Sequence, residues 1–487
     1  MLLGLFWSRL LVRAMGDEVN GLYISFLGVT RLGGLGDLGM GVAVAILIGS
    51  LLGRGEETEL RKQLAAARTM FLLLAGVMLV VFIVLSPWMP GWLGFKEGSG
   101  AGSLTLLFIT GGMSTAIFVL AGYFHSLNYA HGTVWWPMLP TLLLGQMFAP
   151  LLHWLCARAG WPLWIQIMPY LGTNLLIGWF VWRMLKWSHP SLGDLRPLSW
   201  DRRIWKTLAA ASGWAYLWNL GSTIYFVAAR LVINAWIGPA TVTTYQFNYK
   251  ICELSVSLIL AASFVSQPKI MQWLASGDPA NHQRVVTEVN RLNVFQIICA
   301  CAAALGYLAI NDLFIRLWLG PGYHAPLAWQ AAFACNLAVT CSGDAGIQLA
   351  ARSAKTGMKI AGLFVGGTGL LNLALCILAA QRGSTTGVAV ATVIAQSVLT
   401  VGLGIVACRN LGMSSARWVA KSWLLPLAAT VAAAGLKSRL PDESFAHIGS
   451  LIGIYAVLLL IVCAVAGMNA EMLRAEISLV RSLFRPK

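Results

Sequence analysis

Charged residues are scarce in this sequence. Among its 487 residues only 11% are Asp, Glu, Lys or Arg, whereas 58% are hydrophobic and the mean hydropathy is +0.73. Soluble domains carry roughly 25% charged residues. A water-soluble core of this composition would lack polar side chains to cover its surface. The composition therefore excludes a soluble enzyme and a disordered chain, and it predicts a multi-pass membrane protein.

Acidic residues and metal-ligand patterns are also sparse. The chain has 18 Asp and Glu against 34 Lys and Arg, which gives a net charge of +16. Its nine cysteines form no CxxC pair, and its seven histidines show no HExxH spacing. We therefore expect no zinc site, no disulfide framework and no cofactor. In a membrane protein a basic excess is typical of cytoplasmic loops, so no nucleic-acid partner is expected.

Long apolar runs dominate what remains. A membrane-spanning helix needs ~20 mostly apolar residues, and we find fourteen candidates with short connections, which leave no room for a separate soluble domain. The candidates are residues 1–15, 20–51, 68–90, 103–124, 135–156, 162–183, 207–236, 241–267, 291–311, 327–350, 358–380, 386–407, 420–436 and 448–468. The chain is thus predicted to be an all-α polytopic membrane protein.

The distribution of basic residues predicts the orientation of these spans. With the N-terminus inside, the cytoplasmic connections and C-terminal tail hold 23 Lys and Arg, and the opposite loops hold 6. Cytoplasmic loops carry the excess of Lys and Arg in membrane proteins. We therefore expect both termini to be cytoplasmic.

A weak internal repeat relates the first two spans to the seventh and eighth. Five positions match at a constant offset of 222: Leu10, Leu11, Met15, Gly16 and Tyr23 match Val232, Ile233, Ile237, Gly238 and Tyr245. Duplicated halves are common in transporters, with the substrate site between them. The predicted parts are spans 1–6 in residues 1–183, a basic cytoplasmic linker at 184–206, spans 7–12 in residues 207–410, and spans 13–14 with a basic tail in residues 411–487.

Three stretches of sequence resemble a known family. Residues 10–42 combine a basic residue, an acidic turn after Gly, then Gly-Leu-Tyr and Asp-Leu-Gly. Residues 229–269 contain a Gly-Pro turn, a Tyr, an aromatic-basic pair and a closing Pro, and residues 316–323 read RLWLGPGY. Together with the fourteen spans, these features are similar to the polysaccharide flippases of the multidrug/oligosaccharidyl-lipid/polysaccharide exporter superfamily.

The resemblance implies a fold and an activity. The fold would be two pseudo-symmetric six-helix bundles around a V-shaped cavity, with two added C-terminal helices. The activity would be transfer of undecaprenyl-pyrophosphate-linked oligosaccharides, such as O-antigen or exopolysaccharide units, across the bacterial inner membrane by alternating access. Coupling to a proton or sodium gradient and contacts with other polysaccharide-assembly proteins are part of the same expectation.

Charged residues inside the predicted spans are the candidate site residues, because each costs at least ~2.5–3.5 kcal/mol in the membrane. We expect the basic ones to line a cavity that binds the anionic, lipid-linked glycan; they are Arg9, Arg31, Arg230 and Lys250. The acidic ones are candidates for ion coupling; they are Asp37, Glu253 and Asp344.

Structural roles compete with these assignments. Arg9 could extend its side chain to the membrane surface, and Asp37 could satisfy exposed backbone groups. Lys250 and Glu253 are three residues apart and could form only a local ion pair. Asp344 could be a hydrogen-bonded structural carboxylate.

Three alternatives to the polysaccharide flippase differ in substrate or class. A multidrug exporter of the same superfamily is expected to have twelve spans and a less basic cavity. A peptidoglycan-precursor flippase would share the fourteen spans and the arginines, so the sequence separates it poorly. A membrane enzyme of polysaccharide assembly would need a large external loop or a soluble catalytic domain, and the sequence has neither.

Overall fold

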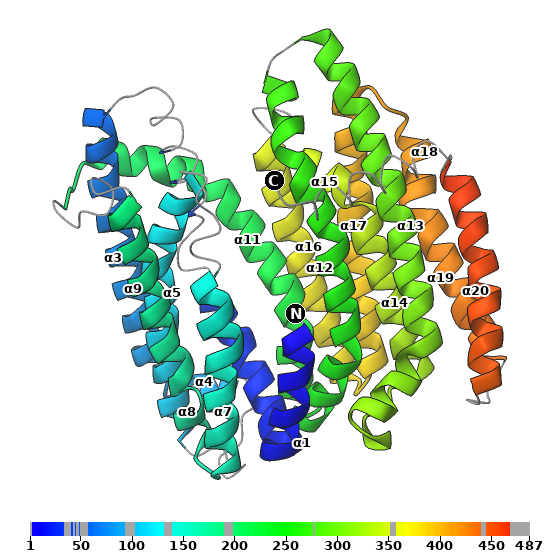
Figure 1. Ribbon diagram of the computed structural model, residues 1–487, viewed down its shortest axis with the longest axis horizontal. Helices are drawn as coiled ribbons and strands as arrows, with labels where there is room; N and C mark the ends of the chain where they lie inside the picture. Colours follow the sequence, from blue (N-terminus) through cyan, green and yellow to red (C-terminus); the bar gives the residue numbers. More distant parts are fainter. Residues whose placement is uncertain are drawn as a thin grey trace. The chain divides into compact units, whose positions relative to one another are not determined.

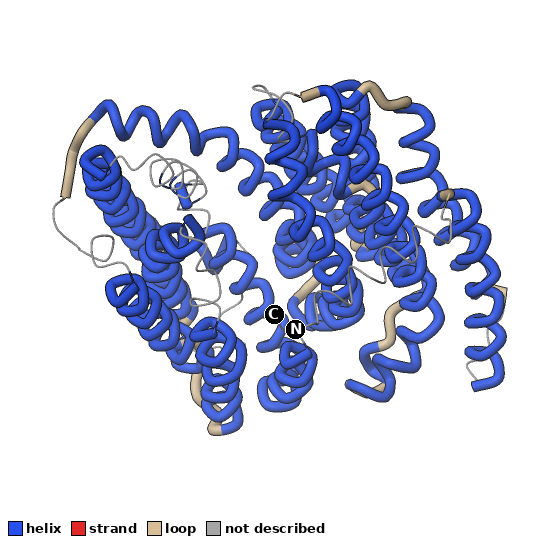
Figure 2. Tube along the Cα trace, turned by 45° about the horizontal axis from the view of Figure 1, so that its top comes forward, coloured by secondary structure: helices blue, strands red, loops and turns tan. Residues whose placement is uncertain are grey.

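The computed structural model describes residues 2–33, 40–41, 44, 48, 57–92, 103–130, 139–188, 198–275, 278–350, 357–439 and 445–467. Within these ranges the chain is helical, with short turns and no strand (Figure 2). It divides into two units. Unit 1 contains residues 1–246 and 365–383, and unit 2 contains residues 247–364 and 384–487.

Unit 1 is built mainly from the N-terminal helices. They are α1 (Leu2–Gly33), α3 (Glu57–Leu85), α4 (Met89–Trp92), α5 (Leu104–Ala130), the π-helix η2 (Thr141–Phe148), α7 (Ala149–Arg158), α8 (Leu163–Gln166), α9 (Met168–Ser188) and α11 (Arg202–Trp236). The start of α12 (Pro239–Ala275) and most of α16 (Gly357–Gln381) complete it.

Unit 2 contains the rest of α12 and the C-terminal helices. They are α13 (Pro279–Trp318), the short η3 (Pro321–Tyr323), α14 (Leu327–Ser342), α15 (Asp344–Ala350), α17 (Thr385–Leu411), α18 (Ser415–Val419), the π-helix η4 (Ala420–Leu424), α19 (Leu425–Lys437) and α20 (Phe445–Ala466). The first residues of α16 also belong to it.

Every predicted span coincides with helix in the described residues. Eight of the described helices are long and apolar enough to cross a membrane. The chain is thus an all-α, multi-pass membrane protein. Several helices extend well beyond the predicted apolar runs: α13 has 40 residues, which is about 60 Å at 1.5 Å per residue. Polar first turns make this possible, and Asp278 caps the first turn of α13 by accepting a hydrogen bond from the backbone N–H of Ala280.

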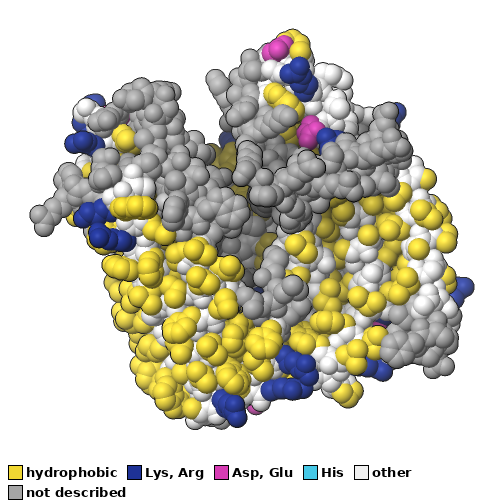
Figure 3. All heavy atoms as spheres, in the orientation of Figure 1, with side chains coloured by type: hydrophobic (Ala, Val, Ile, Leu, Met, Phe, Trp, Pro, Cys, Tyr) yellow, Lys and Arg dark blue, Asp and Glu magenta, His cyan; other side chains and the backbone are white. Residues whose placement is uncertain are grey.

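The core of unit 1 has one apolar cluster toward each end of its helices. Helices α3, α5 and α9 pack side by side (Figure 1). One cluster joins Leu64 of α3, Leu127 of α5 and Leu185 of α9, while the other joins Phe26 of α1, Phe108 of α5 and neighbouring residues. Outside, a broad hydrophobic band covers the face of unit 1 seen in Figure 3, with Lys and Arg gathered at its ends. This is the surface expected of a protein surrounded by lipid.

Two spans of unit 2 are interrupted rather than continuous. The predicted span 327–350 is divided at Gly343 into α14 and α15. The predicted span 420–436 begins with the π-helix η4, and Ser342 Oγ donates a 2.5 Å hydrogen bond to the Ser422 carbonyl within it. Hydrogen bonds between the two irregular points satisfy polar groups that a membrane core leaves without water. Apolar periodicity cannot show such interruptions, because the side-chain pattern continues through them.

The repeat predicted from the sequence has a counterpart in backbone geometry. Gly16 and Gly238, which are related by the offset of 222, both have positive φ, at 77° and 134°. Each divides one helical segment from the next. Positive φ is the conformation that glycine adopts without a steric cost.

These two turns contact each other reciprocally within unit 1. Thr243 Oγ1 donates a 2.7 Å hydrogen bond to the Asp17 carbonyl, and a Cβ at Gly21 would overlap the Pro239 carbonyl oxygen. The offset of 222 relates residue 17 to 239 and residue 21 to 243. Each residue therefore contacts the counterpart of the other, which is the signature of a two-fold axis. The repeat is thus a local structural symmetry.

Candidate functional site

Arg9 lies inside unit 1 on the first segment of α1. It precedes the Gly16 turn by seven residues, or about 10 Å along a helix. The side chain is half-buried, and its buried Nε has no hydrogen-bond partner among the described residues. Two residues earlier, Trp7 Nε1 donates a hydrogen bond to the Gln146 carbonyl and holds this segment against η2. The structure therefore places a guanidinium within the helical bundle.

Arg230 is the most buried of the candidate cations whose side chains are described. It lies on α11, eight residues before Gly238, and is 6% exposed. Because the Gly16 and Gly238 turns touch, Arg9 and Arg230 lie at similar depths from the same end of unit 1. The α11 turn around Arg230 packs on α1, where Gly28 contacts Val227 and Leu231.

Arg31 follows Gly28 by one helical turn. Its backbone is helical within α1, so this third arginine is carried by the segment of α1 just beyond the contact with α11. Its side chain lies outside the described part of the structure. Asp37, predicted as an ion-coupling or structural carboxylate, lies outside the described residues.

Lys250 and Glu253 form an ion pair on α12 in unit 2. Nζ and Oε2 are 2.9 Å apart, and both side chains are 25% exposed. The pair makes burial of both charges tolerable, because each supplies the counter-charge of the other. Its spacing of three residues was the sequence signal. A role in transport for either residue remains a prediction.

Asp344 lies at the first residue of α15, immediately after the interruption at Gly343. It is 7% exposed, and Gln348 Nε2 donates a long 3.5 Å hydrogen bond to Oδ1. The neighbouring Ala345 N–H donates to Gln296 Oε1 of α13. The carboxylate therefore belongs to a buried polar layer at the interrupted span, and its role in ion coupling remains a prediction.

A charged cluster in unit 2 was missed in the sequence. Asp312 of α13 accepts hydrogen bonds from Lys437 at the end of α19 and from Gln330 in the first turn of α14, both at 2.5 Å. His324 Nε2 is 3.0 Å from Oδ1 of the same carboxylate. Asp312 and Lys437 are only 12% and 13% exposed. They fall at the edges of their apolar runs and are 125 residues apart, so no local spacing connects them.

The arginines of unit 1 suit the binding of an anion. The described residues contain no group of three His, Cys, Asp or Glu side chains that could hold a metal ion. The candidate residues described in unit 1 are arginines on membrane-embedded helices. A guanidinium stays charged in any environment and binds phosphate oxygens through two parallel hydrogen bonds.

Comparison with solved structures identifies proteins of the same fold. A lipid II flippase, MurJ, in an inward closed conformation superposes with a TM-score of 0.67 at 15% identity, covering 95% of this chain and 96% of its own. A multidrug resistance MATE family transporter of the MOP superfamily superposes in its inward-facing conformation with a TM-score of 0.65 at 14% identity, covering 84% of this chain and 94% of its own.

The outward-facing conformation of a MATE family transporter gives a TM-score of 0.60 at 15% identity, covering 84% of this chain and 91% of its own. No family model and no curated protein matches the sequence. At these identities the likeness establishes the fold. The chain thus has an α-helical fold that is found in membrane transporters.

Proposed function

We propose that this protein is a flippase that moves undecaprenyl-pyrophosphate-linked oligosaccharides from the cytoplasmic to the periplasmic leaflet of the bacterial inner membrane by alternating access. The observation that carries the proposal is the placement of Arg9 and Arg230 at similar depths inside a membrane-embedded bundle. Buried cations are costly in a membrane. A guanidinium at this depth can bind a pyrophosphate that crosses the membrane, because it stays charged and binds phosphate oxygens through two parallel hydrogen bonds.

The pyrophosphate of the substrate is the anion, and the helices of the protein carry the cations that bind it during transport. In this proposal the arginines replace part of the water that the pyrophosphate loses on leaving the membrane surface. The lipid tail stays in the bilayer, and the glycan follows the headgroup. No bond is made or broken, so the function is transport and not catalysis. Lys250 contributes as a further cation, while Glu253, Asp344 and Asp37 are the candidates for coupling to a proton or sodium gradient.

A peptidoglycan precursor is a second candidate substrate. The lipid II flippase covers 95% of this chain, whereas the MATE transporter covers 84%. The larger coverage by the lipid II flippase supports a lipid-linked substrate over a small drug. A peptidoglycan precursor is one such lipid-linked substrate. Both lipid-linked candidates carry pyrophosphate, so the same arginines serve either one.

The test is a leaflet-resolved assay of lipid-linked intermediates in a strain that lacks this gene. Undecaprenyl-pyrophosphate glycans are extracted, and their leaflet is determined by accessibility to an external enzyme. We expect completed units to accumulate on the inner leaflet and wild-type protein to relieve the accumulation. The chemical identity of the accumulated unit distinguishes a polysaccharide unit from a peptidoglycan precursor.

Variants of the three candidate arginines test whether these residues are needed for the transfer. We expect Arg9→Ala, Arg31→Ala and Arg230→Ala to fail to relieve the accumulation despite normal expression. Arg382→Ala is the matched control, because this arginine is exposed in the turn between α16 and α17. Delivery of all lipid-linked units to the outer leaflet in the deletion strain would contradict the proposal, and drug efflux would then be measured.

A further inference from the structure

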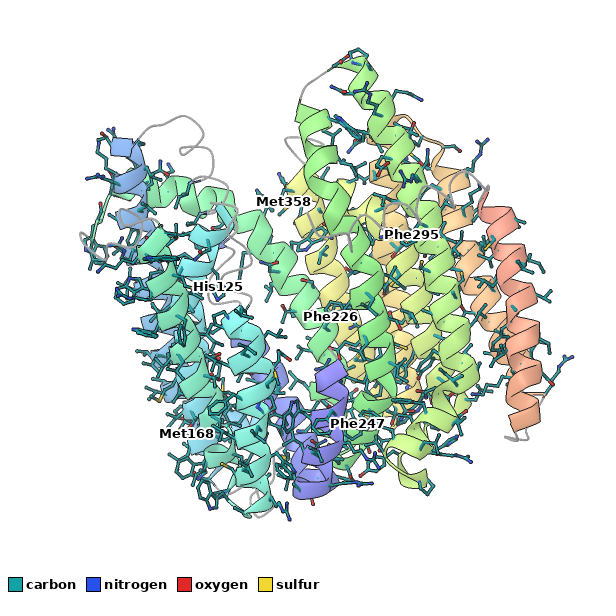
Figure 4. All side chains as sticks on the ribbon, in the orientation of Figure 1. His125, Met168, Phe226, Phe247, Phe295 and Met358 are labelled. Carbon is teal, nitrogen blue, oxygen red and sulfur yellow. The ribbon has the colours of Figure 1, made fainter. Side chains whose placement is uncertain are left out.

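Exposed basic side chains are concentrated at one end of unit 1. At this end α3 and α11 begin and α9 ends, because Leu64, Ile204 and Leu185 of these helices share one apolar cluster. Met168, in the first turn of α9, lies at the opposite end (Figure 4). Among the described side chains, the exposed charged ones at the first end are Arg61, Lys62, Arg183, Lys186, Asp201, Arg202, Arg203 and Lys206.

The opposite end of unit 1 has a more balanced charge. The Gly16 turn and the end of α7 lie there, because Met15 and Trp154 pack against the second apolar cluster. Helix α16 also ends there, since it runs parallel to α11 and Asn372 Nδ2 donates to the Tyr225 carbonyl. Among the described side chains, the exposed charged ones at this end are Arg13, Asp17, Glu18, Arg158 and Arg382. The strong basic excess is therefore a property of one end only.

The chain that leads into α11 is held firmly at the basic end. The Ser199 N–H donates a 3.0 Å hydrogen bond to Thr69 Oγ1 of α3. Asp201 then caps the helix, because its Oδ1 accepts hydrogen bonds from the backbone N–H groups of Arg203 and Ile204, at 2.8 Å and 3.3 Å. The N-terminal N–H groups are thus occupied by Asp201, and the basic side chains are what this end presents to its surroundings.

The first turns of α11 are amphipathic. Ile204 is 9% exposed, and Trp205 packs against the same apolar cluster of unit 1. Arg202, Arg203 and Lys206 are exposed. With 3.6 residues per turn, these three basic side chains span about 100° of the helix surface. The packing of Ile204 and Trp205 therefore turns the basic face of α11 away from the protein.

The basic end lies at the edge of the apolar surface of unit 1. On α9 exposed apolar side chains continue as far as Phe180. Arg183 and Lys186 follow it by about 4.5 Å and about 9 Å along the helix. The polar headgroup layer of a bilayer adds roughly 5–8 Å on each side of the hydrocarbon core. The basic side chains therefore lie at the level of the headgroups, and Figure 3 shows Lys and Arg gathered at the ends of the hydrophobic band.

Exposed tryptophans accompany the basic side chains. Trp187 at the end of α9 is 78% exposed, and Trp200 just before α11 is 68% exposed. The Trp200 ring contacts the Trp205 ring, with centroids 5.2 Å apart. Indole rings are enriched at the membrane–water interface, where one side is apolar and the other is hydrated. A surface that combines exposed indoles with cations fits the headgroup layer better than it fits water alone.

We propose that this surface binds the headgroups of anionic phospholipids and thereby holds the start of α11 at the membrane surface. The basic–tryptophan surface consists of Arg183, Lys186, Trp187, Trp200, Arg202 and Lys206. The cations bind the lipid phosphates, and the indole rings lie between the headgroups. A zwitterionic lipid supplies the phosphate together with a positive charge, so the surface prefers lipids with a net negative charge. This binding is separate from the transported substrate.

The experiment identifies the lipids beside this surface by photo-crosslinking. The full-length protein carries p-benzoyl-L-phenylalanine in place of Leu198, which is 52% exposed next to Trp200. It is reconstituted in vesicles of equal parts phosphatidylglycerol and phosphatidylcholine, and the two cross-linked lipids are quantified. The same probe in place of Leu176, within the apolar surface of α9, reports the bulk ratio. We expect phosphatidylglycerol to be enriched at least about fivefold at position 198 relative to position 176.

Paired variants connect the enrichment to the basic side chains. We expect Arg202→Gln/Lys206→Gln to reduce it to near the bulk ratio. Arg382→Gln/Arg439→Gln is the matched control, because it removes the same charge at exposed positions outside the surface and should keep the enrichment. Thermal unfolding checks that each variant is folded. Salt at about 1 M should weaken the enrichment in the unsubstituted protein, since it screens exposed charges.

Three results would overturn the inference. They are the bulk lipid ratio at position 198, an undiminished enrichment in folded Arg202→Gln/Lys206→Gln, and cross-links to a second copy of the protein instead of lipid. The vesicles contain no lipid-linked glycan, so the outcome is separate from that of the leaflet assay. Either proposal can therefore fail while the other stands.

Discussion

At the scale of single residues, buried charges are the informative feature of this protein. The described residues show two arrangements of buried charge. In unit 2, Lys250 with Glu253 and Lys437 with Asp312 are neutralised by direct ion pairs. In unit 1, Arg9 has a buried Nε without a hydrogen bond. The ion pairs stabilise the fold. The Arg9 Nε–H is left able to donate a hydrogen bond to an anion.

The Lys437–Asp312 pair is predicted to be structural. Lys437→Met leaves the Asp312 carboxylate largely buried without its cation, so we expect the free energy of unfolding to fall by about 3–5 kcal/mol. Chemical unfolding of the purified protein in detergent measures this. The double variant Lys437→Met/Asp312→Asn should recover much of the loss. Lys206→Met, at an exposed position, is the control. Equal stability of Lys437→Met and Lys206→Met would disprove the role.

Exchange of the two charges tests the pair on α12. If the pair only makes burial tolerable, the double variant Lys250→Glu/Glu253→Lys keeps the 2.9 Å contact in reversed order and supports normal transport. If Lys250 meets the anionic substrate, the exchange moves the cation by nearly a full turn of the helix, and transport falls by at least tenfold. The leaflet assay reads the difference, with Glu253→Gln showing the effect of losing the carboxylate alone.

At the scale of elements, close helix contacts depend on glycine. Gly21 of α1 meets the first residue of α12, where an added Cβ would lie 1.8 Å from the Pro239 carbonyl oxygen. Gly221 of α11 meets α16 in the same way, with an added Cβ 2.3 Å from the Val365 carbonyl oxygen. Backbone atoms cannot move aside as flexible side chains can. These contacts therefore fix the helices of unit 1 at short distances.

Substitution of Gly21 is predicted to damage the contact between the two repeat-related turns. Gly21→Ala forces α1 and α12 apart, and we expect a loss of at least about 1–3 kcal/mol in unfolding free energy. The loss appears as a lower midpoint in thermal unfolding. Gly76→Ala on α3 is the control, because an added Cβ there meets nothing within 4 Å. Similar midpoints for the two variants would show that the turns are not held together by this contact.

At the scale of the whole molecule, the sequence predicts the helical type of the chain better than the continuity of its helices. Apolar runs of sufficient length coincide with helix in the described residues, because the bilayer imposes both length and composition. They do not show the π-helix at Thr141 or the interruption at Gly343, beyond which Gln296 Oε1 accepts a hydrogen bond from the Ala345 N–H. Nor do they show the π-helix at Ala420, where Ser342 Oγ donates to the Ser422 carbonyl. Isolated polar residues within apolar runs are the only sequence signal of such points.

The sequence singles out Arg9 and Arg230 because a charge inside an apolar run is conspicuous, and their role in a site stays a prediction. It singles out Lys250 and Glu253 because their spacing is local, and the structure confirms the ion pair between them. The hydrogen bonds from Lys437 to Asp312 and from Tyr23 to Tyr170 join residues more than a hundred positions apart. Their members look ordinary in the sequence, and only the fold brings them together.

Binding of undecaprenyl pyrophosphate to the purified full-length protein tests the central claim most directly. Native mass spectrometry compares this lipid with undecaprenol, which has the same tail and no phosphate. We predict that the pyrophosphate lipid binds at least tenfold more tightly, and that Arg9→Gln and Arg230→Gln each remove most of this preference while Arg382→Gln keeps it. Equal binding of the two lipids, or an unchanged preference in both buried-arginine variants, would contradict a site built to carry a lipid-linked pyrophosphate.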